Sequence, residues 1–391
     1  MSTPHEQQRP ARVLFADHTP IVGGAELVLA THIAALDRSR FHPLVACTDR
    51  VPMLIDLYRE AGADVHLLPM PQLRRLSPAV PLGLLRAAWA FRQLVRRERV
   101  DVVVANTSRA AYIAAVALIG TGVPLIWWVR DFLFGRTAFR LLAGRADRLI
   151  CVSAAIRDYY GGRHDPRFSV IHVGSSLDEE LPDIDPRAVA AERARWGFDS
   201  EDLVVGFMGR LVDDKGPEDV LEAVAIANAT DPRIKLLIVG SGRGQVGDVE
   251  GELQRRVAAR GLDFVVFAGF QRAQALYYRV FDLFVLSTRT PEPYATSVVQ
   301  AMMAEVPVVA TATGGTPELV RDGDTGLLVP PGSPREMANA ILRLAADAGL
   351  RARVTDAARD EVLAHNRERV TTALAEQVYD SLLGRLPATP G

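Results

Sequence analysis

The feature that most constrains the fold is a series of short strands that are apolar on both faces. In the first half they are RVLFAD, HPLVACT, DVHLLPM, VDVVVANT, PLIWWVRD, DRLICVS and FSVIHVG, and segments with helical periodicity separate them. Strands that are buried on both faces belong in parallel sheets with helices on each side. The alternation therefore predicts a doubly wound α/β fold.

A second series follows an interruption: LVVGFMGRL, IKLLIVGSG, FVVFAGF, LFVLSTR, PVVATATGG and TGLLVPPGS. The segment between the two series is acidic, contains prolines and lacks an apolar strand, and 391 residues exceed the roughly 150 of one ordinary domain. We expect an N-terminal Rossmann-like domain over 1–180, a linker over 181–200 and a C-terminal Rossmann-like domain over 201–365, with the two domains facing a cleft. A helix within 366–391 is expected to pack back on the N-terminal domain.

Composition narrows the class of protein. The 45 basic and 47 acidic side chains give a formal charge of −2, so no overall positive field attracts nucleic acid. The two cysteines, Cys47 and Cys151, lie in apolar runs and are expected to be buried free thiols of a reducing compartment. The N-terminus MSTPHEQQRPA lacks the basic start and apolar core of a signal peptide. We therefore expect a cytoplasmic protein that does not bind nucleic acid.

Two cations follow the first strand of the second series, in GFMGRLVDDKG. Arg210 and Lys215 share one strand-to-helix loop, and ligands of doubly wound folds collect at the carboxyl ends of the strands. Arginine offers phosphate oxygens a bidentate fork, and lysine offers a point charge. The loop is a candidate diphosphate site. The alternative is a solvated loop that is salt-bridged through Asp213 and Asp214.

A second candidate site lies in LFVLSTRTPEPYATSVVQAMMAEVPVVATATGG, which predicts a strand, a loop, a helix and another strand. The helix is expected to start near 295–297, where unpaired backbone N–H groups and the helix dipole favour an anion. Glu292 precedes this start and is suited to accept hydrogen bonds from sugar hydroxyls. Gln300 shares a helix face with Thr296 and is suited to a ribose. The alternatives are a solvated loop acid and an ordinary polar residue of a helix.

These segments carry a family resemblance. GRLVDDKG, VVFAGF, EPYATSVVQAMMAEVPVVAT and GGTPELVRDGDTGLLVPPGS, in that order and spacing, resemble the donor domain of retaining glycosyltransferases of family four, which have the GT-B fold. The resemblance covers nearly all of the second half. The first half is similar in a weaker way, with a glycine loop, Gly23 to Glu26, after its first strand. The resemblance implies a GT-B fold and sugar transfer from a nucleotide-diphosphate sugar with retained anomeric configuration.

The resemblance also assigns roles to single residues. Arg210 and Lys215 match the cations that hold the diphosphate, and Glu292 matches the first acid of the paired-glutamate motif, which contacts the donor sugar. These three are the candidate catalytic residues. The remaining donor-side matches are Gly24 beside the diphosphate, Phe270 beside the base, Gln300 at the ribose, and Ala295, Thr296 and Ser297 as the helix-start amides.

Three positions depart from the family pattern. Gln300 replaces the second glutamate, and its amide can bond ribose hydroxyls only without charge assistance. Arg130, in WWVRDF, replaces a histidine near the reacting centre, and Ala295 replaces a glycine. Gly23 and Arg130 are the candidate acceptor-side residues.

Other signals are weaker. GSGRGQ resembles a dinucleotide fingerprint, but Gln245 stands where its third glycine belongs, which disfavours a dehydrogenase. Asp183 and Asp185 form a D-x-D within the expected linker, and the histidines show no zinc spacing, so we predict no metal and no cofactor. The arginine-rich segment 72–99 predicts either a weak membrane-surface contact or, more simply, an ordinary amphipathic surface helix.

The sequence therefore predicts a metal-independent glycosyltransferase with mainly electrostatic catalysis. Its partners are expected to be a nucleotide-diphosphate sugar and a small polar acceptor, such as a metabolite or a natural-product intermediate. Two alternatives stay open. A nucleotide-sugar epimerase of the same fold would turn over donor without acceptor, and a degenerate, non-catalytic sugar-nucleotide binder would bind donor without turnover.

Overall fold

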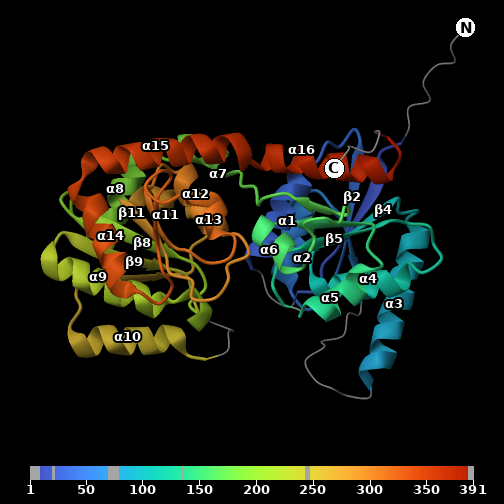
Figure 1. The fold of residues 1–391 in the computed structure, drawn as a ribbon, viewed down its shortest axis with the longest axis horizontal. Helices are drawn as coiled ribbons and strands as arrows, with labels where there is room; N and C mark the ends of the chain where they lie inside the picture. The colour runs from blue at the N-terminus through green and yellow to red at the C-terminus, as the bar shows by residue number, and fades with distance from the viewer. Residues whose placement is uncertain (1–8, 20–22, 69–78, 134, 243–246, 386–391) are drawn as a thin grey trace, which may run out of the picture. The chain divides into compact units, whose positions relative to one another are not determined.

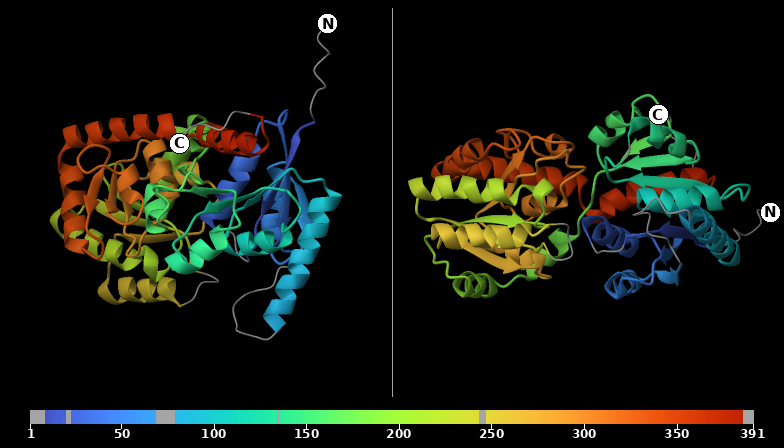
Figure 2. Two further views of the ribbon diagram at one scale, coloured as in Figure 1. Left: turned by 45° about the vertical axis from the view of Figure 1, so that its right-hand side comes forward. Right: turned by 90° about the horizontal axis from the view of Figure 1, so that it is seen from below.

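The computed structural model describes residues 9–19, 23–68, 79–133, 135–242 and 247–385 (Figure 1). The chain divides into two compact units. The first comprises residues 1–174 and 368–391, and the second comprises 175–367. Each unit is a parallel sheet with helices on both faces (Figure 2). The prediction of a doubly wound α/β fold is confirmed.

The first unit holds a seven-stranded sheet in the order β3-β2-β1-β4-β5-β6-β7. The strands are β1 (Ala11–Ala16), β2 (Phe41–Cys47), β3 (Asp64–Leu67), β4 (Val102–Ala105), β5 (Leu125–Val129), β6 (Arg148–Cys151) and β7 (Phe168–Val170). The helices are α1 (Gly24–Ala35), α2 (Pro52–Glu60), α3 (Ala79–Arg97), α4 (Ser108–Ala117), α5 (Arg136–Ala143), α6 (Ala154–Tyr159) and α16 (Glu368–Leu382).

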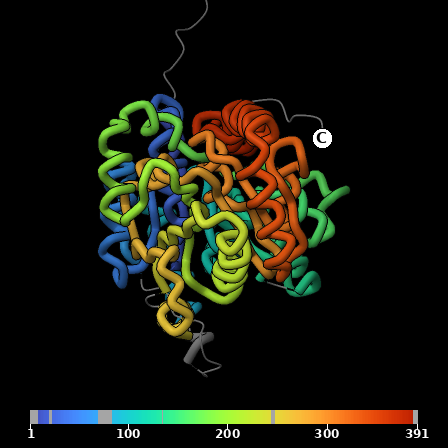
Figure 3. Tube along the Cα trace, turned by 90° about the vertical axis from the view of Figure 1, so that its left-hand side faces the viewer, coloured from blue at the N-terminus to red at the C-terminus, as the bar shows by residue number. Residues whose placement is uncertain are grey.

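The second unit holds a six-stranded sheet in the order β10-β9-β8-β11-β12-β13, and Figure 3 looks onto this unit. The strands are β8 (Leu203–Met208), β9 (Ile234–Val239), β10 (Val265–Gly269), β11 (Leu283–Leu286), β12 (Val308–Thr311) and β13 (Leu327–Val329). The longer helices are α8 (Pro186–Arg195), α9 (Pro217–Thr230), α10 (Val249–Arg260), α11 (Gln274–Val280), α12 (Thr296–Met303), α14 (Pro334–Ala346) and α15 (Ala348–His365). The short helices are α7 (Leu177–Glu180), η1 (Leu181–Asp183), η2 (Asp213–Lys215) and α13 (Thr316–Leu319).

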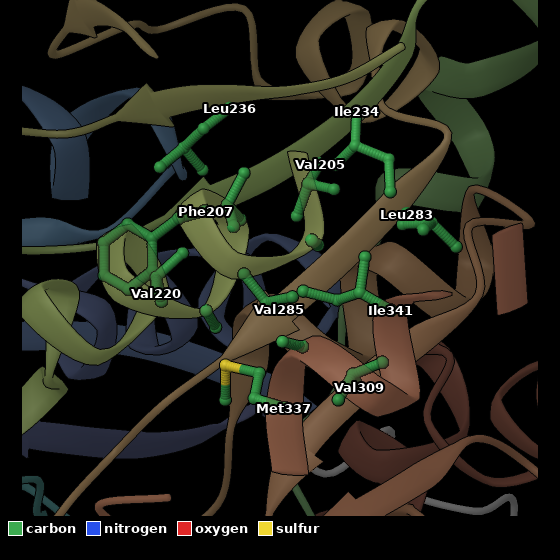
Figure 4. Packing of buried hydrophobic residues seen from close by; sticks show 14 of the residues in the cluster. Val205, Phe207, Val220, Ile234, Leu236, Leu283, Val285, Val309, Met337 and Ile341 are labelled. Carbon is green, nitrogen blue, oxygen red and sulfur yellow. The ribbon is translucent and has the colours of Figure 1, made fainter. Parts of the chain in front are cut away.

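The core of the second unit explains why its strands are apolar throughout. Val205 and Val285 from neighbouring strands pack against Val220 of α9 and against Met337 and Ile341 of α14 (Figure 4). All five side chains are almost fully buried. Burying apolar surface is the main favourable term in folding, so this packing fixes the sheet whose edge carries the candidate site.

The segment predicted as a linker differs from the prediction. Within 181–200, residues Pro186–Arg195 form α8, which contacts α11 in the second unit. The Arg193 guanidinium donates hydrogen bonds to the Val280 carbonyl at 3.1 Å and to Asp282 at 3.0 Å. The segment was predicted to be a linker because it lacks an apolar strand, but hydrogen bonds from Arg193 attach it to the second unit. The first boundary between units falls between residues 174 and 175.

The C-terminal helix α16 belongs to the first unit and contacts α1. His32 of α1 lies between two hydroxyls of α16, with Nδ1 3.0 Å from Thr372 Oγ1 and Nε2 2.9 Å from Tyr379 Oη. Burial lowers the pKa of His32 to about 3, so this imidazole is neutral. Hydrogen bonds of a neutral, buried histidine therefore join α16 to α1.

The two cysteines are buried free thiols, as the sequence predicted. Burial raises the pKa of Cys47 and of Cys151 to about 12.

The arginine-rich segment 72–99 is described in part, since residues 72–78 lie outside the described residues. In α3, Leu85 and Trp89 are exposed one turn apart. Among the described helices, none is long and apolar enough to span a membrane.

Candidate active site

The candidate site of the second unit lies at the carboxyl ends of β8 and β11, which are neighbours in the sheet. From β8 the chain crosses over to β9 on one side, while β11 pairs with β8 on the other side. Such a reversal of strand order leaves a crevice at the carboxyl ends, where ligands bind in this type of sheet. The loops after these two strands contain Arg210, Lys215 and Glu292.

The structure brings Lys215 and Glu292 together. Lys215 Nζ lies 2.5 Å from Glu292 Oε2, and Thr288 Oγ1 donates to the same oxygen at 3.1 Å. The Glu292 side chain is only 7% exposed, whereas that of Lys215 is 22% exposed. A carboxylate this buried requires a partner, and the lysine supplies it while remaining accessible on one side.

The Lys215 loop is held by the loop after β11. Ser287 Oγ lies 2.7 Å from the Lys215 carbonyl oxygen and 2.8 Å from that of Gly216. Gly216 adopts a left-handed φ of +59°, and a Cβ there would lie 2.4 Å from the Ser287 carbonyl oxygen. Only glycine permits both the conformation and the close approach. The two loops thus position Lys215 as a unit.

Arg289 is a positioning residue that the sequence analysis missed. Its guanidinium pairs with Asp213 at 2.7 Å, Asp219 at 2.8 Å and Glu218 at 3.3 Å. The pKa of Arg289 is raised, chiefly by the hydrogen bond with Asp219. The only sequence signal is that these three acids lie within seven residues, next to the predicted cations Arg210 and Lys215. Asp213, which the alternative of a salt-bridged loop invoked, pairs with Arg289 of the loop after β11.

The glycine pair after β12 contacts Glu292 through the backbone. Gly315 N–H donates to the Glu292 carbonyl oxygen at 2.8 Å. Gly314 has a φ of +54°, and a Cβ there would lie 2.1 Å from the same oxygen. The GG of the GGTPELV segment therefore sets the position of the Glu292 backbone.

Gln300 is held at both ends of its amide. Gln300 Oε1 lies 3.1 Å from Tyr278 Oη, and Gln300 Nε2 lies 3.1 Å from Gln274 Oε1. Tyr278 is fully buried, and burial raises the pKa of its hydroxyl far above the ordinary value. Tyr278 and Gln274 were not predicted, because both lie on α11, far from Gln300 in the sequence.

Gln300 variants separate a ribose contact from a purely structural role. We expect Gln300→Glu to bind a nucleoside diphosphate as tightly as the parent or tighter, because a carboxylate accepts hydroxyl bonds with charge assistance of about 1 to 2 kcal/mol. Gln300→Leu should bind it about tenfold less tightly, and Glu292→Gln should leave this affinity unchanged. Calorimetric titration measures all three. Parent-like affinity in Gln300→Leu would remove Gln300 from the ribose.

The other donor-side residues lie at the same edge of the sheet. Ala295 is the buried N-cap of α12, Thr296 is its first residue, Ser297 follows, and no side chain caps this terminus within the described chain. Phe270 follows β10 and is 63% exposed, so its ring has a face available for stacking. Arg210 follows β8 and is exposed. These positions are compatible with the predicted roles, which stay predictions.

The remaining predicted residues lie in the first unit. Gly23 N–H donates to Glu26 Oε2 at 2.8 Å, and Gly24 is the first residue of α1. Arg130 follows β5, and its guanidinium carbon lies 4.4 Å from the centre of the Trp128 ring. Burial lowers the pKa of Arg130 to about 10.

Buried acids surround Arg130. Burial raises the pKa values of Asp17 and Glu26, and it raises the pKa of Glu368 to about 7. Glu368 accepts hydrogen bonds from Thr31 at 3.1 Å and from Thr372 at 3.0 Å. Ionisation of these buried acids therefore destabilises the folded state of the first unit.

The pKa of Glu368 gives a testable pH dependence. Between its ordinary pKa of 4.5 and the folded value near 7, the folded chain keeps a proton that the unfolded chain releases. Stability therefore falls as pH rises through this range, and the loss is complete above pH 7. Glu368→Gln stays neutral and should be more stable than the parent by on the order of 3 kcal/mol at pH 8, and much less so at pH 5. Urea titrations at both pH values measure this, and equal gains at both would contradict it.

The D-x-D pair has a structural role in α8. Asp185 is the N-cap, and its carboxylate accepts the Arg187 N–H at 2.8 Å, while Asp183 ends a single helical turn. No group of three or more potential metal ligands gathers among the residues that the structure describes.

Comparisons with known proteins find relatives for both units. Residues 22–179 match the family model described as "Glycosyltransferase Family 4", and residues 189–361 match the one described as "Glycosyl transferases group 1". The chain is similar to the D-inositol 3-phosphate glycosyltransferase of Streptomyces bingchenggensis, 32% identical over 62% of this chain and 55% of the relative. It is also similar to the alpha-D-kanosaminyltransferase of Streptomyces kanamyceticus, 32% identical over 46% of this chain and 45% of the relative. The matches thus span about half of these relatives.

Solved structures extend the likeness over almost the whole chain. HepE of Anabaena, solved with UDP-glucose, superposes with a TM-score of 0.82 at 26% identity, covering 95% of this chain and 99% of HepE. Sucrose-phosphate synthase of Thermosynechococcus elongatus superposes with a TM-score of 0.78 at 20% identity, over 96% of this chain and 100% of that one, which shows the fold. The two family models together cover most of both units, and the sheets and structural neighbours agree with them. The chain belongs to the family-four glycosyltransferases of the GT-B fold.

Proposed function

We propose that this chain transfers a sugar from a nucleoside-diphosphate sugar to an acceptor hydroxyl, with retention of anomeric configuration. The observation that carries the proposal is the Lys215–Glu292 pair at the carboxyl ends of β8 and β11, the switch point where the strand order of the second sheet reverses. A buried acid and an accessible cation at one point suit a donor whose sugar accepts and donates hydrogen bonds and whose diphosphate is anionic. HepE binds UDP-glucose, which supports a nucleotide-sugar donor here.

In the proposed mechanism the catalysis is electrostatic. As the bond between sugar and diphosphate breaks, negative charge grows on the leaving oxygen. Arg210, Lys215 and the uncapped start of α12 at Thr296 stabilise that charge. Glu292 orients the sugar, and the leaving phosphate takes the proton of the acceptor hydroxyl, which attacks on the same face. The acceptor is a small polar metabolite or natural-product intermediate, and the relative named as a D-inositol 3-phosphate glycosyltransferase supports this class.

Ligand-induced stabilisation tests the donor. UDP, GDP, ADP and dTDP, and then the corresponding sugar nucleotides, are added to the full chain while its thermal midpoint is followed. A ligand at a hundred times its Kd stabilises the folded state by about 2.7 kcal/mol. We expect at least one nucleoside diphosphate to raise the midpoint in the parent and not in Lys215→Ala. No response to any of them would contradict the proposal.

The proposal also predicts behaviour toward chelators. Because Arg210, Lys215 and a helix start carry the charge that a metal would neutralise, turnover should stay within about twofold after exhaustive treatment with EDTA. A complete loss that Mg²⁺ or Mn²⁺ restores would contradict the metal-independent mechanism.

Turnover with and without acceptor separates the remaining alternatives. An epimerase would convert donor alone, and a non-catalytic binder would bind donor without turnover. The Lys215–Glu292 pair supports transfer over epimerisation, because an epimerase needs acid–base groups around the sugar.

A further inference from the structure

A second set of polar side chains lies in the first unit, at the carboxyl ends of β1, β4 and β5. In this sheet β1 and β4 are neighbours, and their pairing runs to Ala16 opposite Ala105. The chain leaves β1 toward β2 on the other side, so this is the switch point of the first sheet. Asn106 directly follows β4, and Arg130 directly follows β5.

The Arg130 guanidinium presents an unused fork. Its Nε and Nη2 are buried and have no hydrogen-bond partner among the described residues. These two N–H groups form one edge of the planar guanidinium, the edge that binds two oxygens of a carboxylate or phosphate side by side. The cation–π contact of Arg130 with the Trp128 ring, 4.4 Å from guanidinium carbon to ring centre, helps to hold the guanidinium in place. A buried charged donor pair without an acceptor is costly, so it points to a ligand.

Asn106 is an independent second observation. It is 1% exposed, yet neither Oδ1 nor Nδ2 has a hydrogen-bond partner in the described part of the chain. Its backbone N–H donates to the Ala16 carbonyl oxygen at 2.9 Å, which fixes it beside the end of β1. A buried amide without partners is rare in folded proteins.

The buried acids around Arg130 do not accept hydrogen bonds from its Nε and Nη2. Tyr58 donates to Asp17, the Gly23 N–H donates to Glu26, and Thr31 and Thr372 donate to Glu368. None of these carboxylates bonds to the Arg130 fork. The Arg130 guanidinium therefore lacks a hydrogen-bond acceptor. A protonated amine ligand would not supply one.

We propose that the acceptor substrate carries an oxyanion, a carboxylate or a phosphate, which Arg130 binds through Nε and Nη2. Asn106 bonds the neighbouring polar groups of the same molecule. This proposal rests on the proposed function, because it names the chemical class of the acceptor. The raised pKa values of Glu26 and Glu368 support it, since neutral acids repel an anion less.

The test uses inorganic phosphate and acetate as probes of the full chain. Because phosphate also suits the donor site, titrations are made in a Lys215→Ala background, with calorimetry and Trp fluorescence as readouts. Arg130→Gln should weaken phosphate or acetate binding at least tenfold, and Arg130→Lys, which keeps the charge and loses the fork, by about threefold. Asn106→Leu should weaken it less than Arg130→Gln does. The control is Arg163→Gln, whose surface arginine pairs with Asp158, and it should bind like the parent.

The outcomes are decisive. Tighter binding of phosphate than acetate assigns a phosphorylated acceptor, and the reverse assigns a carboxylate. Equal anion affinity in the parent background, Arg130→Gln and Arg130→Lys would overturn the proposal, as would the absence of binding by either anion. If Arg130→Gln does not fold, Arg130→Lys decides by the same criterion. Nucleoside-diphosphate binding by the parent is measured separately, so a failed donor site and a failed oxyanion site give different results.

Discussion

Replacing Lys215 by alanine is expected to reduce turnover at saturating donor by at least about a hundredfold. The change removes a cation from the leaving diphosphate, and it also leaves Glu292, 7% exposed, without its charged partner. Steady-state kinetics with the donor identified by thermal stabilisation measure the loss. Lys235 provides a matched control, because it is the only other lysine and pairs with Asp202 at 3.7 Å. Lys235→Ala should turn over at a rate within about twofold of the parent.

Arg210→Ala tests the second cation of the same loop. We expect a loss of similar size, because Arg210 is assigned to the same developing charge, and circular dichroism should show an unchanged fold. Near-parent rates in both Lys215→Ala and Arg210→Ala would place the diphosphate elsewhere.

The fold class was predictable because strands that are buried on both faces consist of apolar residues. The strands VVVA (102–105) and LVVGFM (203–208) carry no polar side chain on either face, as expected for a sheet that is covered on both faces. The linker prediction failed for the converse reason. Helix α8 has no buried residue, and it is attached by Arg193, so hydrophobic periodicity gave no signal for it.

The candidate site was predictable only in part. Arg210, Lys215 and Glu292 lie in loops that follow apolar strands, and their charge marks them in the sequence. Arg289 was missed because its role depends on three acids, one in η2 and two in the first turn of α9, that are distant from it in the sequence. Asn106 was missed for a similar reason, because the absence of hydrogen-bond partners is a property of the folded surroundings.

Gly314→Ala is expected to reduce sugar transfer by about a hundredfold, the cost of moving a substrate-positioning group by about 1 Å. The added Cβ would lie 2.1 Å from the Glu292 carbonyl oxygen, so the Glu292 loop must move. Alanine at the φ of +54° also costs about 1 kcal/mol in stability, independent of the site. The measurement compares kcat for sugar transfer with the affinity for the nucleoside diphosphate.

Gly323→Ala separates the contact from the backbone strain. Gly323 has a similar φ of +74° in the same unit, but a Cβ there would meet no atom within 4 Å. Both variants should therefore lose comparable stability, while only Gly314→Ala should lose transfer. Because Glu292 is assigned to the sugar, Gly314→Ala should keep nucleoside-diphosphate affinity within about threefold of the parent, a difference of less than 1 kcal/mol. Equal transfer rates in the two variants would show that the exact position of the Glu292 backbone does not matter for the reaction.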